Sequence, residues 1–371
     1  MEKIKIIHII KSLGRGGAEM LLPETLKKHN QNQFEFHYIY FLPWKNQMVE
    51  AIETAGGKVT CLPANNNIQL LLRFPKIIKY CKENNIQVIH AHLPWAGFVS
   101  RLVHKITKIP VLYTEHNLQE RYHFITRRIN RLTFNWQTIG IGVSEDVTKS
   151  ILKNIKPKIP CTTILNGVNT DDFLRESQSE RARIRALYAI PENAIVVGTV
   201  AVFRFQKRLD LWLEVISEAI KTNPNIYGII VGAGPLEQEL FDKHKALHLE
   251  GKVIFTGLQV NVKPFYEAMD IFMMTSSFEG LPIALLEAMS MGCAVVSTNA
   301  GGVKEVLQPE IDGILVDVDQ WSVLKSELSA LSNNEKQLNY YQVQARKRVV
   351  ASFSIGVMVE QLENYYLKHI K

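Results

Sequence analysis

The segment from Ser276 to Met291, SSFEGLPIALLEAMSM, combines two carboxylates with a predicted helix start. Two serines end an apolar run, and a proline followed by strong helix formers predicts that a helix begins there. Glu279 then lies in the loop before the helix, and Glu287 lies inside it. Amides at a helix start can bind a diphosphate, and this turn contains Gly280, Leu281, Pro282 and Ile283. The two carboxylates would accept hydrogen bonds from sugar hydroxyls. The alternative is that Glu279 is a helix-capping acid and Glu287 a solvated helix residue.

Basic side chains follow another apolar run, in VAVFRFQKRLDLW. Lys207 lies there between Arg204 and Arg208, just after a predicted strand. Cations at such a position neutralise the charge that grows on a departing diphosphate, and this stabilisation is often the largest catalytic term. The pattern indicates a leaving-group site, with an exposed basic loop as the alternative.

Glycines open the first predicted helix, in the loop Gly14–Glu19. The missing side chains of Gly16 and Gly17 allow a ligand to approach the backbone closely. A dinucleotide-binding fingerprint would need a third glycine where Glu19 stands. The second strand, FEFHYIYF, also lacks the acid that binds a cofactor ribose. A nicotinamide enzyme is therefore disfavoured.

Three histidines lie at strand ends. His116, in LYTEHN, follows an apolar strand and is expected to point into a ligand cleft. We interpret His90 and His92, in VIHAH, as facing opposite sides of a strand, so that one lines an acceptor site and the other packs inside. Histidine, aspartate and glutamate do not recur at metal-ligand spacing, and the four cysteines form no metal or disulfide pattern. We therefore expect no metal site and no cofactor.

Apolar runs that alternate with helix-like segments position these residues. The predicted strands of the first half are KIKIIHII, FEFHYIYF, KVTCLP, QVIHAH, PVLYTEH and TIGIGVS. Those of the second half are AIVVGTVAVF, NIYGIIVGAG, KVIFTGL, IFMMTS and CAVVSTNA. Such series predict an α/β fold of two Rossmann-like, doubly wound domains with a cleft between them. We place the domains at residues 1–170 and 171–371, with a last helix at about 355–371 that packs back on the first domain.

The composition is that of a globular protein of 371 residues, 46% hydrophobic and 21% charged. No run of eighteen apolar residues predicts a membrane span, and the N-terminus lacks a secretory signal, so we expect a cytoplasmic protein. Residues 1–168 hold 23 basic and 11 acidic side chains, a net charge of +12, whereas the remainder hold 20 and 25, a net charge of −5. The basic half predicts a negatively charged partner: nucleic acid, an anionic membrane or a phosphorylated acceptor.

The segment Glu120–Trp136 interleaves aromatic residues with basic ones. Such a segment can lie on an anionic membrane surface. Its candidate contact residues are Arg121, Arg127, Arg128 and Arg131. An amphipathic helix with a charged outer face fits equally well. Peripheral attachment to the inner face of a membrane is thus one expectation for this chain.

These motifs, in their order and spacing, resemble the retaining glycosyltransferase family four, or glycosyl transferases group 1, which has the GT-B fold. The family has two glutamates with seven residues between them, matched by Glu279 and Glu287. Further matches are the short motifs GGAE, HAH, TEH, NGV, GAGP and DGILV, which extend the resemblance over most of the chain. One motif alone is weak, but their common order is specific.

The resemblance implies a metal-independent, hexosyltransferase-type enzyme. Its donor would be a nucleotide diphosphate sugar, most commonly a UDP-sugar, bound mainly by the second domain. Its acceptor would be a saccharide or a lipid-linked molecule of surface polysaccharide biosynthesis, bound mainly by the basic first domain. Glu287 would bind the donor ribose, and Glu279 would contact the transferred sugar. His116 would lie near the anomeric centre.

The resemblance also assigns the remaining candidates. The backbone at Gly16 and Gly17 would lie against the donor phosphates or the acceptor. The family arginine lies five residues before the catalytic lysine, where this chain has Val202, and Arg204 is the expected substitute. The acceptor-side candidates are Glu19, His90, His92 and Asn166.

Two other classes of function fit part of the pattern. A nucleotide-sugar epimerase or a glycosyl phosphorylase would use the same two-domain cleft without a carbohydrate or lipid acceptor. A non-catalytic polyanion-binding protein would explain the basic half. It would not explain Glu279, Glu287 and the glycine loops, and we expect no nucleic-acid partner.

Overall fold

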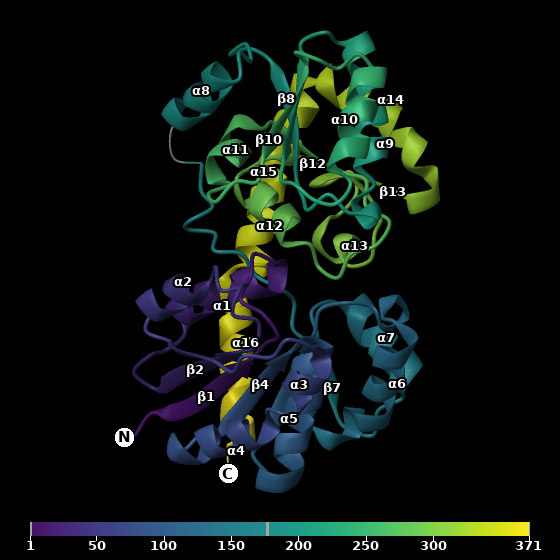
Figure 1. The fold of residues 1–371 in the computed structure, drawn as a ribbon. Coiled ribbons are helices and arrows are strands. Elements are labelled where there is room, and N and C mark those ends of the chain that lie inside the picture. The colour runs from purple at the N-terminus through teal and green to yellow at the C-terminus, as the bar shows by residue number, and fades with distance from the viewer. Residues whose placement is uncertain (1, 176–177, 371) are drawn as a thin grey trace. The chain divides into compact units, whose positions relative to one another are not determined.

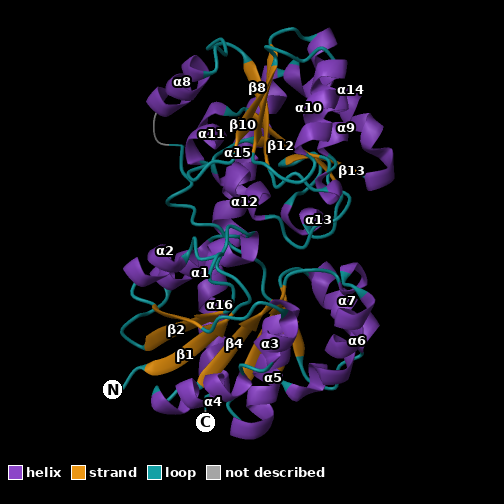
Figure 2. Cartoon of the chain, viewed as in Figure 1, coloured by secondary structure: helices purple, strands orange, loops and turns teal. Residues whose placement is uncertain are grey.

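The structure, a computed structural model, describes residues 2–175 and 178–370, which form two compact units (Figure 1). One unit comprises the chain up to Gly167 together with the segment from Ile355. The other comprises Val168–Ser354. Each unit is a parallel sheet with helices on both faces (Figure 2). None of the described helices is long and apolar enough to cross a membrane.

The first unit contains a seven-stranded sheet in the order β3-β2-β1-β4-β5-β6-β7. Its strands are β1 (Ile4–Ile9), β2 (Phe34–Tyr40), β3 (Lys58–Cys61), β4 (Val88–His92), β5 (Val111–Glu115), β6 (Ile139–Gly142) and β7 (Cys161–Thr163). Its helices are α1 (Gly17–Lys28), α2 (Val49–Thr54), α3 (Asn67–Leu71), α4 (Phe74–Glu83), α5 (Leu93–Thr107), α6 (Phe124–Thr133), α7 (Glu145–Ile155) and α16 (Ile355–His369), with short 3-10 turns η1 (Gln119–Arg121) and η2 (Phe134–Trp136).

The second unit contains a six-stranded sheet in the order β10-β9-β8-β11-β12-β13. Its strands are β8 (Ile195–Val200), β9 (Ile226–Val231), β10 (Val253–Gly257), β11 (Ile271–Met274), β12 (Ala294–Thr298) and β13 (Gly313–Val316). Its helices are α8 (Gln178–Leu187), α9 (Leu209–Thr222), α10 (Glu237–Ala246), α11 (Lys263–Ala268), α12 (Ile283–Ser290), α13 (Val303–Val306), α14 (Leu324–Ser332) and α15 (Glu335–Ser352), with 3-10 turns η3 (Phe205–Lys207) and η4 (Val318–Val323).

Side chains alternate between two apolar cores in the first unit. Ile6 packs on one face of the sheet, in a cluster that includes Leu362 and Tyr366 of α16. Its neighbour Ile7 packs on the other face, with Val99 of α5. Because every second residue shares a face, each strand serves both layers of helices. The last helix of the chain is thus part of the core of the first unit.

The predicted doubly wound α/β fold is confirmed, and all the strands predicted from apolar runs are present. Two strands were not predicted. Both β7 and β13 are short and lie at sheet edges, where a strand contributes few buried side chains and has little apolar signal. The chain passes from the first unit to the second between Gly167 and Val168, just before the boundary proposed from the sequence.

Candidate active site

The sheet of the second unit reverses its strand order between β8 and β11, which pair directly. In open α/β sheets, ligands bind beyond the carboxyl ends of the strands at such a reversal. The loop after β8 contains Lys207, and the loop after β11 contains Glu279. The predicted leaving-group and sugar-binding residues are therefore brought together at the switch point of this sheet.

Lys207 and Glu279 form an ion pair, with 2.7 Å between Nζ and Oε1. Ser276 donates a second hydrogen bond to the same carboxylate oxygen at 2.6 Å. The side chains of Lys207 and Glu279 are only 22% and 12% exposed, so water screens the pair weakly. This paired, half-buried lysine is not the exposed basic loop that the sequence left as an alternative.

Backbone contacts fix the lysine loop against the loop after β11. The Thr275 hydroxyl donates to the carbonyl oxygens of Lys207 and Arg208, and the Ser277 amide donates to Gln206 at 2.8 Å. The GAGP segment packs against the start of the lysine loop, because a Cβ on Gly232 would lie 2.0 Å from the Ala201 carbonyl oxygen. Only glycine permits this approach at a φ of +132°.

A second glycine loop supports the glutamate. Gly301 has a φ of +61°, and a Cβ there would lie 2.1 Å from the carbonyl oxygen of Glu279. The Gly302 amide donates to the Gly280 carbonyl at 3.0 Å. The loop after β12 is therefore seated directly on the turn that precedes α12, which holds the Glu279 backbone in place.

Helix α12 begins at Ile283, with Pro282 as its N-cap and no side-chain cap. Its first amides can therefore serve an anion, as predicted for this turn. Gly280 is half-buried, whereas the Leu281 side chain is 5% exposed and belongs to the core. The contribution of Leu281 to a ligand site is thus limited to its backbone.

Glu287 lies on the buried side of α12 and is 6% exposed, so it is not a solvated helix residue. Tyr266 of α11 donates a hydrogen bond to its Oε2 at 2.8 Å. Burial and the adjacent carboxylate raise the pKa of Tyr266 well above its usual value, so the phenol remains a donor. Sequence analysis missed Tyr266, because nothing in the sequence links its helix to α12.

Arg204 lies immediately before η3 with an exposed side chain, and Val202 is exposed as well. The neighbouring Arg208 instead donates to the Val318 carbonyl at 3.1 Å, so it has a structural partner. The resemblance expects an arginine at position 202, where this chain has Val202. That Arg204 takes over the role of this arginine stays a prediction.

In the first unit, the predicted glycine loop leads into α1 through Gly16, its N-cap. The Glu19 carboxylate folds back over this loop, so that a Cβ on Gly16 would lie 2.3 Å from Glu19 Oε2. Ser12 donates to the other oxygen of Glu19 at 3.0 Å. An acid in the first turn favours the helix N-terminus, which gives Glu19 a structural role beside its predicted acceptor-side role.

His116 follows β5, as expected, and burial lowers its pKa to about 4, so the ring is neutral at physiological pH. Its Nε2 is buried and makes no hydrogen bond within the described residues. Its backbone amide donates at 3.0 Å to Glu115, a buried carboxylate that also accepts bonds from Tyr113 and Gln119. This network holds the histidine loop on the end of β5.

The interpretation that His90 and His92 face opposite sides of β4 is wrong. Residues two apart in a strand share a face because successive side chains alternate. The two rings are stacked, with centroids 4.2 Å apart, and both are buried. His90 hydrogen-bonds Tyr366 and Thr114 at 2.7 Å each. His8, which sequence analysis did not consider, joins them from β1.

Asn166 is also buried, at 4% exposed, shortly before the chain enters the second unit. The next residue, Gly167, directs its amide to Met358 Sδ of α16 at 3.3 Å. An acceptor contact by Asn166 stays a prediction.

The 3-10 turn η1 and helix α6 present the predicted basic surface. Its four candidate residues are all exposed, Arg121 in η1 and Arg127, Arg128 and Arg131 in α6. Phe124, Ile125 and Leu132 are exposed among them, by 61%, 56% and 67%. By contrast, Phe134 lies in the core, so only part of the aromatic pattern belongs to this surface.

Two family models match the chain. The model "Glycosyltransferase Family 4" matches residues 15–172, and the model "Glycosyl transferases group 1" matches residues 180–348. The chain belongs to glycosyltransferase family four. This membership favours a transferase over the epimerase, phosphorylase and polyanion-binding alternatives.

Two relatives of this glycosyltransferase match over nearly their whole length. An Escherichia coli protein named UDP-Gal:alpha-D-GlcNAc-diphosphoundecaprenol alpha-1,3-galactosyltransferase is 24% identical over 98% of the chain and 97% of its own length. A Campylobacter jejuni protein named N-acetylgalactosamine-N,N'-diacetylbacillosaminyl-diphospho-undecaprenol 4-alpha-N-acetylgalactosaminyltransferase is also 24% identical, over 98% of the chain and 99% of its own length.

The fold of the glycosyltransferase is that of GT-B enzymes. The crystal structure of Anabaena HepE in complex with UDP and glucose aligns with a TM-score of 0.86 at 19% identity, over 98% of this chain and 100% of the other. A Thermosynechococcus elongatus sucrose-phosphate synthase aligns with a TM-score of 0.83 at 16% identity, over 99% of each chain.

Proposed function

We propose that this glycosyltransferase transfers a sugar from a UDP-sugar to a lipid-linked saccharide, with retention of the anomeric configuration, in the synthesis of a surface polysaccharide. The observation that carries the proposal is the Lys207–Glu279 ion pair at the switch point of the second sheet, beside the uncapped start of α12. The names of the two bacterial relatives and the UDP in the HepE structure support the choice of donor and acceptor.

Lys207 is suited to stabilise the leaving group. As the bond between the sugar C1 and the diphosphate oxygen breaks, negative charge grows on the diphosphate. The ammonium group has three donors, of which one is used by Glu279, so it can contact a phosphate without leaving its partner. Arg204 and the amides at the start of α12 add positive potential.

The two glutamates are suited to hold the donor. Lys207 and Ser276 both bind Oε1 of Glu279, so Oε2 can accept a bond from a hydroxyl of the transferred sugar. Tyr266 fixes the Glu287 carboxylate, whose lone pairs can accept bonds from the two ribose hydroxyls. Charge-assisted bonds of this kind are the strong ones in a shielded site.

The reaction then needs no carboxylate nucleophile. The acceptor hydroxyl attacks C1 on the face from which UDP departs, and its proton passes to a phosphate oxygen of the leaving UDP. One C–O bond forms and one breaks, and the configuration at C1 is kept. His116 is neutral, and its Nε2 can hydrogen-bond a hydroxyl of the donor sugar. Lysine, arginine and backbone amides supply the positive charge that a divalent ion would otherwise give.

The first unit is proposed to bind the acceptor, and α6 to bind an anionic membrane that carries it. The net charge of +12 over residues 1–168 favours a phosphorylated lipid surface. Exposed Phe124, Ile125 and Leu132 lie among the arginines of α6 and would insert between headgroups. The enzyme would then work peripherally, on the inner face of the membrane.

Acceptor-dependent transfer tests the proposal. Protein in EDTA, without added Mg²⁺ or Mn²⁺, is incubated with radiolabelled UDP-sugars and a diphosphoundecaprenol-linked saccharide. We expect label in the lipid product only with acceptor, and NMR of that product should show the donor's anomeric configuration. Inversion, strict dependence on a divalent ion, or epimerised UDP-sugar formed without acceptor would each contradict the proposal. When Lys207→Ala is compared in this assay, the matched control is Lys221→Ala, which changes an exposed lysine of α9.

A further inference from the structure

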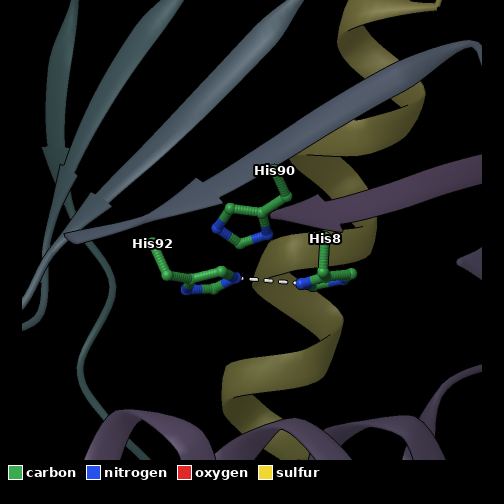
Figure 3. A group of neighbouring side chains, drawn as sticks. All are labelled: His8, His90 and His92. Carbon is green, nitrogen blue, oxygen red and sulfur yellow. Dashed lines mark hydrogen bonds between the residues drawn. The ribbon is translucent and has the colours of Figure 1, made fainter. Parts of the chain in front are cut away.

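Three buried histidines converge where the first sheet reverses its strand order, between β1 and β4. His8 of β1 lies opposite His90 in the parallel register, and His92 follows two residues later on the same face. Figure 3 shows the three rings turned toward one another. One ring nitrogen from each lies within 4.8 Å of the other two. The closest pair is His8 Nδ1 and His92 Nε2, at 2.9 Å.

Buried nitrogens without partners are a second observation at this cluster. His8 Nε2 and His92 Nδ1 make no hydrogen bond within the described residues, although the two side chains are 2% and 6% exposed. The hydroxyl of Tyr38, whose ring stacks on His8, is likewise buried without a partner. A buried polar group without a hydrogen-bond partner destabilises the folded state. The two unpartnered ring nitrogens lie on the far side of each ring from the His8–His92 contact, so the atoms that face a shared ligand position are His8 Nδ1 and His92 Nε2.

The rings are in the protonation state that binds a metal. Burial lowers the pKa of His8, His90 and His92 well below its usual value, and the neighbouring histidines lower it further. Each neutral ring carries one N–H and one lone pair, and the proton that His8 and His92 share between their facing nitrogens must move to an outer ring nitrogen when an ion binds. His90 uses both ring nitrogens, Nδ1 with Tyr366 and Nε2 with Thr114, so binding an ion requires one of these bonds to open while the other orients the ring.

We propose that the first unit binds one Zn²⁺ ion through His8, His90 and His92. Imidazole nitrogen suits Zn²⁺, whereas Mg²⁺ and Ca²⁺ require oxygen ligands. Zn–N bonds of about 2.0–2.1 Å in a tetrahedral site place ligand nitrogens roughly 3.3 Å apart. The nitrogens here are separated by 2.9 Å to at most 4.8 Å, so shifts of the rings suffice. Water completes the coordination, as in other three-histidine sites.

The ion has a structural role in this assignment. It joins the central strands β1 and β4, and through His90 and Tyr366 it braces α16 against the sheet. It takes no part in the donor chemistry proposed for Lys207, Glu279 and Glu287. The inference therefore goes beyond the proposed transfer reaction, and it is tested without any nucleotide sugar.

Zinc binding is measured on full-length protein without an affinity tag, stripped with EDTA and then dialysed. Titration against a chromophoric chelator should show one equivalent of Zn²⁺ and a higher Tm for the loaded protein. His8→Gln and His90→Gln, each checked by circular dichroism, should weaken binding at least about 100-fold. His37→Gln should leave it unchanged, because this buried histidine bonds Glu35 and Tyr80 away from the cluster.

Cobalt gives a readout that does not depend on any variant folding. Co²⁺ bound to the wild-type protein should develop the intense visible absorption of a tetrahedral site, and Zn²⁺ should abolish it. Absence of that band, or Zn²⁺ binding that survives His8→Gln, would overturn the assignment. Failure here would leave acceptor-dependent transfer untouched, and failure of transfer would leave zinc binding untouched.

Discussion

The two units differ in electrostatics at the switch point, the place in each sheet where the strand order reverses. In the second unit the switch point between β8 and β11 carries a charged pair, Lys207 and Glu279, which is partly open to solvent. In the first unit the switch point between β1 and β4 carries neutral, buried histidines. Charges prepared for a diphosphate must remain accessible, whereas neutral rings can be enclosed in the core at little desolvation cost. The same fold position thus carries an accessible ion pair in one unit and a buried histidine cluster in the other.

Lys207→Ala would remove the charge from the second unit's switch point. We expect turnover to fall by roughly a hundredfold or more, because the diphosphate loses its nearest cation while Glu279 is left unpaired. Lys207→Arg keeps the charge and should recover part of the rate. The measurement is steady-state transfer with donor and acceptor saturating. Wild-type turnover in Lys207→Ala would remove this residue from the active site.

Glu287→Gln tests whether the buried carboxylate holds the donor. The amide keeps the volume and can still accept from Tyr266, but it loses the charge that strengthens bonds from the ribose hydroxyls. We expect UDP to bind about 10- to 100-fold more weakly, as measured by isothermal titration calorimetry. Tyr266→Phe should have a smaller effect in the same direction. Unchanged affinity in both variants would contradict the assignment.

Acid should distinguish the units. The histidines whose pKa is lowered by burial all lie in the first unit, and that of His116 falls from 6.5 to about 4. Below pH 6.5 the unfolded chain binds more protons than the folded one, so stability is full above pH 6.5 and falls as pH decreases toward 4. His116 alone should cost about 1 kcal/mol at pH 5.5.

Limited proteolysis at pH 5.5 and 7.5, with fragments mapped by mass spectrometry, measures this effect. At the lower pH, cleavage should appear first in the first unit, and it should be slower in His116→Gln. Earlier cleavage of the second unit would show that the buried histidines do not set the acid sensitivity.

The smallest effect is expected at α6, where the charges are exposed. Arg128→Gln should weaken binding to anionic vesicles about fivefold, since one arginine near such a surface contributes about 1 kcal/mol. Vesicle sedimentation at two salt concentrations checks this. Lys149→Gln, an exposed lysine of α7 that pairs with Glu145, is the control. Equal losses in the two variants would favour a diffuse attraction over an α6 surface.

Sequence patterns predicted the features that depend on a single continuous segment of the chain. Long apolar runs located every central strand, and glycine, glutamate and lysine spacing located the Lys207–Glu279 site. The partners contributed by distant segments had no such signal. Tyr266 reaches Glu287 from another helix, and His8 meets His90 only because β1 and β4 pair in register. The wrong facing assigned to His90 and His92 came from misapplying the two-residue period of a strand, which puts both on one side.

The central claim, a UDP-sugar site in the second unit that works without a metal, is tested most directly by a thermal-shift screen. Wild-type protein in EDTA is heated with UDP, GDP or ADP, and the same series is run on Glu287→Gln. We predict that UDP raises the Tm of the wild-type protein, that GDP and ADP do not, and that the UDP shift disappears in Glu287→Gln. Stabilisation by GDP or ADP instead of UDP, or a UDP shift that requires a divalent ion or survives in Glu287→Gln, would contradict it.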